Sequence, residues 1–171
     1  NNGKLILDPM NACTFRQEQY EWLINKALDF SSKGADKTNW QTVVFSHISF
    51  APGFNAAPCS VNANGVELDD NGNVVISGGS PVLCENGVYK AIYAFKTGSL
   101  LSYSHLDNWQ EGRATIAQRD SQGNPMTDGQ GNLIPVTKDF SSQGAMTLIG
   151  VFSGHEHLYK NLDYNGIIFR T

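Results

Sequence analysis

Three of the four histidines stand at the ends of apolar segments. His47 ends the segment Trp40–His47, and His155 and His157 end a second such segment. In open sheets packed with helices, ligands bind at the carboxyl ends of the strands, so these imidazoles can face one crevice. Neutral imidazole binds Zn, Mn and Fe, and two such cations about 3.5–4 Å apart can hold a nucleophilic hydroxide for phosphoryl chemistry. The pattern predicts metal ligation by all three histidines.

The same histidines have a plainer interpretation, which is a turn where they only make hydrogen bonds. Three histidines also make an incomplete two-metal site, because hard divalent cations favour carboxylate oxygens. Gly154, directly before His155, is expected to let the backbone turn sharply and approach its neighbour closely. Glu156 follows, and we expect its side chain to point away from the candidate ligands. His105 lacks a strand-end context, so we expect it in a loop or on the surface.

The elements before His47 are a predicted strand, helix and second strand. Lys4–Asp8 is a short apolar run that ends at Asp-Pro, which is typical of a buried strand. Thr14 and Gln17 have the spacing of a capping box. The helix that follows has one apolar face, made by Tyr20, Leu23, Ile24, Ala27 and Leu28. The apolar run Val43–Phe45 then favours a strand buried on both faces.

The second half of the chain alternates between helix and strand patterns. Glu85–Ser99 has a helical period, and Gly98 is the expected C-terminal stop of this helix. Met146–His157 predicts a buried strand that runs into a turn, and Gly166–Thr171 begins another strand. This alternation predicts an α/β domain, mixed and layered. The segments 52–84 and 112–140 are rich in Gly and Asn and predict β-hairpin insertions. No repeat is expected at a fixed period.

Aromatic side chains and thiols carry less information. Four large aromatic residues are expected in the core: Trp22, Trp40, Phe45 and Phe95. The spacing of the three cysteines, Cys13, Cys59 and Cys84, fits no disulfide framework or zinc knuckle. We expect free thiols, although a bridge between the second and third stays open. Low cysteine usage leans towards a reducing compartment such as the cytoplasm without assigning one.

Size and charge narrow the class of protein. The chain has 171 residues and a net charge of -4, from 12 basic and 16 acidic side chains. This length suits one ordinary domain, and this charge makes nucleic acid an unlikely partner. No apolar run approaches the roughly 18–20 residues that a membrane-spanning helix needs. Since the sequence begins with neither Met nor a leader, we expect it to be part of a longer product.

The order of these segments resembles the C-terminal half of the calcineurin-like metallophosphoesterases. The family has a helix with the pattern Gln-x-x-Trp-Leu, supplied here by Gln19–Leu23. It has a lone histidine after the next strand, which matches His47, and a Gly-His-x-His motif after a later strand, which matches Gly154–His157. The resemblance implies a layered α-β-β-α sandwich, with residues 1–171 as the C-terminal part of one domain.

The resemblance also assigns ligands and leaves others missing. His47 and His155 would bind one metal ion and His157 the other, the two ions being Mn, Fe or Zn. The family supplies its remaining ligands and its catalytic histidine through Asp-x-His, Gly-Asp and Asn-His motifs, and this sequence contains none of them. Asp8 matches a family position that binds no metal. We therefore expect the remaining ligands on a missing N-terminal part of the domain, in the same chain or a separate one.

Two functions follow as hypotheses. The first is metal-dependent hydrolysis of a phosphomonoester or phosphodiester by a metal-bridging hydroxide, to which this chain contributes half of the site and is inactive alone. The second is a non-catalytic binding or structural module of a larger assembly, with an incomplete metal site. Metal content distinguishes them, because two transition ions per complete domain favour the enzyme. Neither hypothesis involves a membrane.

Overall fold

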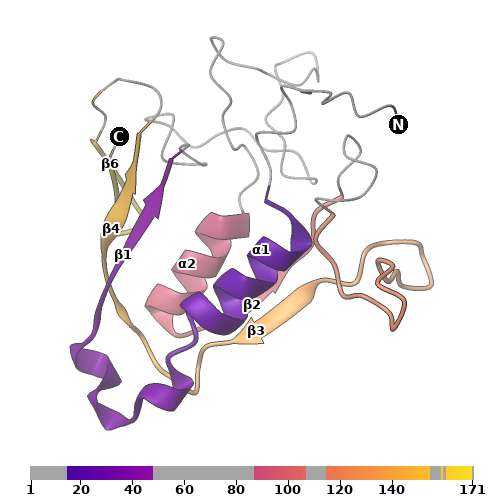
Figure 1. Cartoon of the computed structure of the whole chain (residues 1–171), viewed down its shortest axis with the longest axis horizontal. Coiled ribbons are helices and arrows are strands. Elements are labelled where there is room, and N and C mark those ends of the chain that lie inside the picture. The colour runs from indigo at the N-terminus through magenta and orange to yellow at the C-terminus, as the bar shows by residue number, and fades with distance from the viewer. Residues whose placement is uncertain (1–14, 48–86, 107–114, 155–158, 160, 171) are drawn as a thin grey trace, which may run out of the picture.

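The fold contains a four-stranded sheet and a second, two-stranded sheet (Figure 1). The computed structural model describes residues 15–47, 87–106, 115–154, 159 and 161–170. In spatial order, the larger sheet has β1 (Gln41–Ser46), β4 (Thr147–Ser153), β6 (Ile167–Arg170) and β5 (Asn161–Tyr164). Strands β1, β4 and β6 are parallel, and β5 returns antiparallel to β6. In the smaller sheet, β2 (Leu100–Tyr103) pairs with β3 (Val136–Asp139) in antiparallel fashion. The predicted mixed α/β architecture is therefore confirmed, and the structure adds that the larger sheet is mostly parallel.

The first helix begins as α1 (Gln17–Trp22) and continues as one turn of π-helix, η2 (Leu23–Ala27). The amide of Arg16 donates to Oε1 of Gln19 over 2.9 Å, so the first turn is closed two residues later than the capping box predicted from the sequence. The predicted apolar face is confirmed: Tyr20, Ile24 and Leu28 are buried, and Leu23 and Ala27 are half-buried. Two short 3-10 turns, η3 (Ser31–Lys33) and η4 (Ala35–Asn39), lead from this helix to β1.

The helix α2 (Gly87–Thr97) is the centre of the fold and confirms the helix predicted in this segment. Ala91, Ala94 and Phe95 pack into a cluster shared with the first helix, β2 and β3. Val88 and Ile92 pack into a second cluster with the four-stranded sheet. One helix therefore joins both sheets, and it can do so because apolar residues occupy two of its sides.

The end of α2 depends on a glycine. Gly98 has a φ of 64°, which an L side chain rarely adopts. A Cβ atom at this position would lie 2.5 Å from the carbonyl carbon of Gly144 and 2.6 Å from the amide nitrogen of Ala145. The glycine predicted as a helix stop is thus required twice, by its backbone angle and by the close approach of a second segment.

The prediction that β1 is buried on both faces is wrong. Its side chains alternate between exposed and half-buried, and Val43 and Phe45 are 37% and 79% exposed. The reason is topological, because β1 lies at the edge of the described sheet, and the packed cluster with α2 covers only the face that carries Val44. On the opposite face, Phe45 contacts Phe152 of β4, with ring centroids 5.7 Å apart. We call this exposed face the outer face of the sheet.

The core prediction for the large aromatic residues fails for three of the four. Phe95 is fully buried, whereas Trp22, Trp40 and Phe45 are exposed. Trp40 lies where η4 meets β1 and packs on the edge of Phe30, with Lys33 above its ring. Tyr20, which the helical period did predict, fills the core position beside Tyr103 of β2.

The described part of the insertion 112–140 contains a short repeat, contrary to the expectation of none. Asp120–Asn124 and Asp128–Asn132 both read Asp-x-Gln-Gly-Asn, and in each the aspartate accepts hydrogen bonds from the amides two and four residues later. The backbones of Gln118, Met126 and Ile134 close a ring of three hydrogen bonds of 2.8–2.9 Å. The turns of the predicted hairpins are therefore present, and each lies between two residues of this hydrogen-bonded ring.

Some predictions concern residues outside the described part of the chain. These are the strand Lys4–Asp8, the hairpins of 52–84, and the three cysteines. Within the described ranges, none of the helices has the length and apolar character that crossing a membrane would need.

Candidate metal site

The parallel pairing of β1 and β4 brings two of the predicted segments to one edge. Ser46 is the register partner of Ser153 at the carboxyl ends of the two strands. One residue further, the amide of Gly154 donates to the carbonyl oxygen of His47 over 3.1 Å. His155 follows Gly154 directly in the sequence. The backbone therefore places the carboxyl ends of these two strands side by side.

The side chains of this edge are only partly described. The imidazole of His47 is exposed to solvent. His155, Glu156 and His157 lie outside the described residues, so their predicted roles stay predictions. Among the residues that the structure does describe, no group of three or more His, Cys, Asp or Glu side chains is placed to hold a metal ion.

Contacts within the described residues do not by themselves require glycine at Gly154. A Cβ atom there would meet the carbonyl oxygen of His47 at 3.9 Å, which is ordinary van der Waals contact. Its φ is not among the positive values that exclude other residues. The glycine with a tight environment in this strand is Gly150, where a Cβ atom would lie 3.0 Å from the carbonyl oxygen of Ile168 in β6. Among the described residues of this strand, it is therefore Gly150, inside the sheet, that a close backbone neighbour favours as glycine.

Of the two places expected for His105, the surface is wrong, whereas the residue does lie outside the named strands, in an isolated β-bridge. His105 is only 4% exposed, and its backbone exchanges two hydrogen bonds with Ile116, of 2.9 and 2.8 Å. This bridge extends the pairing beyond β2 and buries the histidine beside the main core. The sequence lacks a local signal for it, because Ile116 follows His105 only after a largely polar segment.

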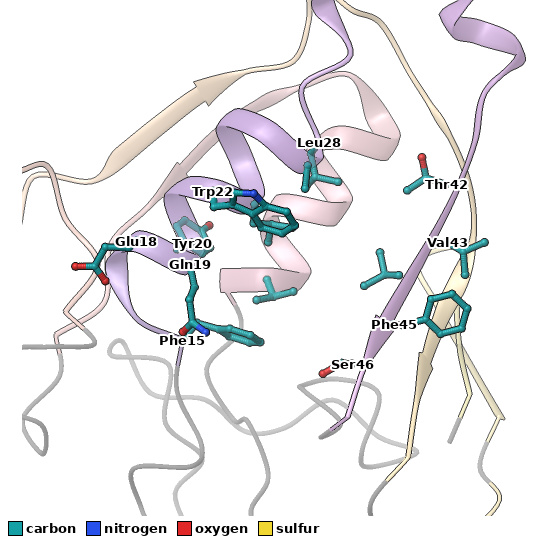
Figure 2. A pocket seen from close by; sticks show the side chains of 14 residues that line it. Phe15, Glu18, Gln19, Tyr20, Trp22, Leu28, Thr42, Val43, Phe45 and Ser46 are labelled. Carbon is teal, nitrogen blue, oxygen red and sulfur yellow. The ribbon is translucent and has the colours of Figure 1, made fainter.

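Sequence reasoning missed an apolar groove of about 550 Å³ between the first helix and β1 (Figure 2). Trp22 and Leu28 line it on the helix side and Val44 on the strand side, whereas the side chains of Val43 and Phe45 point away from the helix (Figure 2). Thr42 also lines the groove, and its hydroxyl oxygen is buried with no hydrogen-bond partner among the described residues. The sequence gives one sign of this groove: Trp22 is a large apolar residue that lies off the apolar face formed by Tyr20, Ile24 and Leu28, and the structure leaves it 61% exposed.

Comparison with known proteins adds no relative. The chain matches no family model, no curated protein and no solved structure.

Proposed function

We propose that this chain carries the histidine-bearing half of a dinuclear metal centre, and that the complete domain hydrolyses phosphate esters as a calcineurin-like metallophosphoesterase. The observation that carries the proposal is the hydrogen bond from the amide of Gly154 to the carbonyl of His47. It joins the carboxyl ends of two parallel strands, where ligands bind in open sheets of this class. The residue after Gly154 is the first histidine of the Gly-His-x-His motif.

The chemistry of the donors fits first-row divalent ions. Imidazole nitrogen suits Mn, Fe and Zn, and the His47 side chain is open to solvent at the edge of the sheet. In this proposal His47 and His155 hold one ion and His157 the other. Such ions activate water and neutralise charge on a phosphoryl group. The carboxylates that they also need would come from the rest of the domain.

The exposed outer face fits the same proposal. Parallel sheets are usually covered on both faces, whereas here Val43 and Phe45 on the outer face stay exposed. In a layered α-β-β-α sandwich, a second sheet packs against this face. We propose that the missing part of the domain supplies both that sheet and the remaining metal ligands.

A metal titration tests the ligand assignment. We expect the chain to bind Mn²⁺ or Zn²⁺ weakly, and His47→Ala, His155→Ala and His157→Ala each to lower the affinity about tenfold or more, which is about 1.4 kcal/mol. Isothermal titration calorimetry measures this loss. The control is Gln41→Ala, an exposed residue at the opposite end of β1. Affinity unchanged in all three histidine variants would contradict the proposal.

An activity measurement tests whether the site is divided. The chain alone, supplied with Mn²⁺ or Zn²⁺, should hydrolyse bis(p-nitrophenyl) phosphate no faster than the metal salt does. Full turnover by the chain alone would show that it holds every ligand the reaction needs, and the inference of a half-site would then be wrong.

A further inference from the structure

The edge of the sheet at β1 is unlike the other edge. At the far side, β5 is a four-residue strand that carries the charged Asp163. Charges and short length are two common ways to protect an edge from unwanted pairing. The β1 sequence, Gln-Thr-Val-Val-Phe-Ser, contains neither a charge nor a proline, and within the described residues it pairs only with β4. Strand β1 therefore has the composition of an internal strand.

The groove described above runs along this open edge. The first helix forms one wall of the groove, and the backbone edge of β1 forms the other (Figure 2). Its apolar lining indicates a space that an additional apolar segment would fill. An unpaired backbone edge beside apolar side chains fits an extended apolar strand better than a polar ligand.

The direction of the chain identifies the segment. α1 begins at the end of the molecule where β1 finishes, and it runs opposite to β1 (Figure 1). A strand that leads into α1 must therefore end at the carboxyl edge of the sheet, parallel to β1. Strand–helix–strand crossovers of this kind are right-handed and place consecutive strands as neighbours in most sheets. Because β4 occupies one side of β1, the open side is the place for it.

We propose that the groove is the docking site of this chain's own segment Lys4–Asp8, as a parallel strand beside β1. The segment reads Lys-Leu-Ile-Leu-Asp, with three apolar residues in succession. Five residues extend over about 17 Å, close to the length of the six-residue β1, at about 3.3 Å per residue. Residues 9–15 then connect it to the N-cap Arg16, which is close to the usual length of about 2–6 residues for such a loop.

Amide hydrogen exchange on the full chain, free of metal ions, tests this proposal. Alternate amides of a parallel strand point to opposite sides, so half of the β1 amides face β4 and half face the groove. We expect the groove-side amides of β1 to exchange about 100-fold more slowly than that of the exposed turn residue Gly129, as in a paired strand. Exchange at the rate of Gly129 would overturn the proposal.

Two variants identify the occupant. Leu5→Pro removes one backbone amide and disfavours a central strand. It should therefore raise the exchange rate of the groove-side amides of β1 about tenfold or more, while the exchange rate of the amides bonded to β4 stays unchanged. Asn2→Pro, in the same terminal region, is the matched control and should change neither set. If Leu5→Pro does not fold, Leu5→Ala gives the same comparison with a smaller effect.

Other occupants give different results. Protection that falls when the protein is diluted would indicate a second copy of the chain, and protection unaffected by either Leu5 variant would indicate another segment. Both results would contradict the proposal. Since the measurement uses no metal, it stands or fails separately from the proposed phosphoesterase activity.

Discussion

Helix α2 divides the described structure into a closed side and an open side. On the closed side, the first helix, α2 and the two-stranded sheet enclose a cluster in which Phe95 and Phe140 are fully buried. On the open side, the four-stranded sheet is packed on one face, and Phe45 on its outer face is 79% exposed. Both sides have apolar residues at the spacing of buried strands and helices. The difference shows that a second layer, and not the strand's own sequence, decides whether such residues are buried.

The largest expected effect comes from truncating one phenylalanine on each side. Phe95→Ala should lower the free energy of unfolding by about 3–5 kcal/mol, because it leaves a cavity among the rings of Phe30 and Phe140. Phe45→Ala should cost about 0.5 kcal/mol or less, as exposed substitutions do. Urea unfolding, with the slope of each transition checked against the parent protein, measures both values.

The matched pair also tests the open side directly. If Phe45→Ala proves as costly as Phe95→Ala, then the outer face is covered in the protein in solution. The division into a closed and an open side would then be wrong for the isolated chain.

Local sequence patterns predicted the helices well. The apolar period that begins at Tyr20 and the glycine stop at Gly98 were sufficient, because a helix satisfies its backbone within one segment. The position of His47 and Gly154 at one edge of the sheet follows from the rule that parallel strands end at a common edge, whereas the direct pairing of their strands was not predicted. The burial of Val43 and Phe45 was not, because it depends on which layers cover the sheet.

The remaining errors have the same origin in long-range pairing. His105 is buried by a bridge to Ile116, and the intervening segment gives no sign of that pairing. The groove beside β1 likewise arises from the distance between a helix and a strand that the sequence separates by two 3-10 turns. Neither feature has a periodicity that a single segment could reveal.

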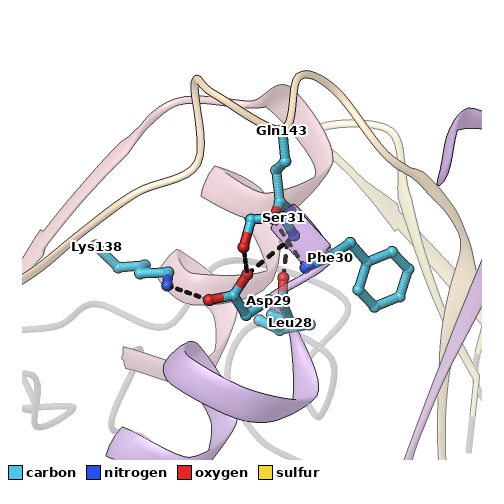
Figure 3. Close-up of polar contacts among 6 residues, drawn as sticks. All are labelled: Leu28, Asp29, Phe30, Ser31, Lys138 and Gln143. Atoms are coloured by element: carbon cyan, nitrogen blue, oxygen red, sulfur yellow. Dashed lines mark hydrogen bonds and ion pairs between the residues drawn. The ribbon is translucent and has the colours of Figure 1, made fainter. Parts of the chain in front are cut away.

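A smaller effect is expected from a glutamine that closes the end of the first helix. The side chain of Gln143 is buried, accepts a hydrogen bond from the amide of Phe30 at 3.0 Å, and donates to the carbonyl of Leu28 at 3.2 Å (Figure 3). Gln143→Leu leaves the buried carbonyl of Leu28 and the partly buried amide of Phe30 without this partner, and should cost about 2 kcal/mol. Gln130→Leu, at an exposed turn, is the control and should cost about 0.5 kcal/mol or less.

The same urea measurement decides this prediction. Equal stability of the Gln143 and Gln130 variants would mean that the contact between the helix end and the segment after β3 adds nothing to the closed side. The closed side would then depend on its apolar cluster alone.

The smallest effect is expected at the ion pair that borders the closed side. Nζ of Lys138 lies 2.6 Å from Oδ2 of Asp29, and this contact, with two hydrogen bonds from Ser31, lowers the pKa of Asp29 to about 2 (Figure 3). Because the folded pKa is below the ordinary value of 3.8, the pair stabilises the fold above pH 4 and loses this effect as the pH falls towards 2. Both side chains are partly exposed, so water screens the pair and Asp29→Asn should cost only about 1 kcal/mol at pH 7.

The test of this last prediction is the dependence of that cost on pH. Urea unfolding of the parent chain and of Asp29→Asn, from pH 7 down to the lowest pH at which both fold, should give a stability difference that shrinks below pH 4. Asp36→Asn, an exposed aspartate of η4, is the control and should show a smaller difference at pH 7. A difference for Asp29→Asn that stays constant over this range would mean that the carboxylate charge is not what stabilises the contact, and that the hydrogen bonds of Ser31 hold this end of the helix by geometry alone.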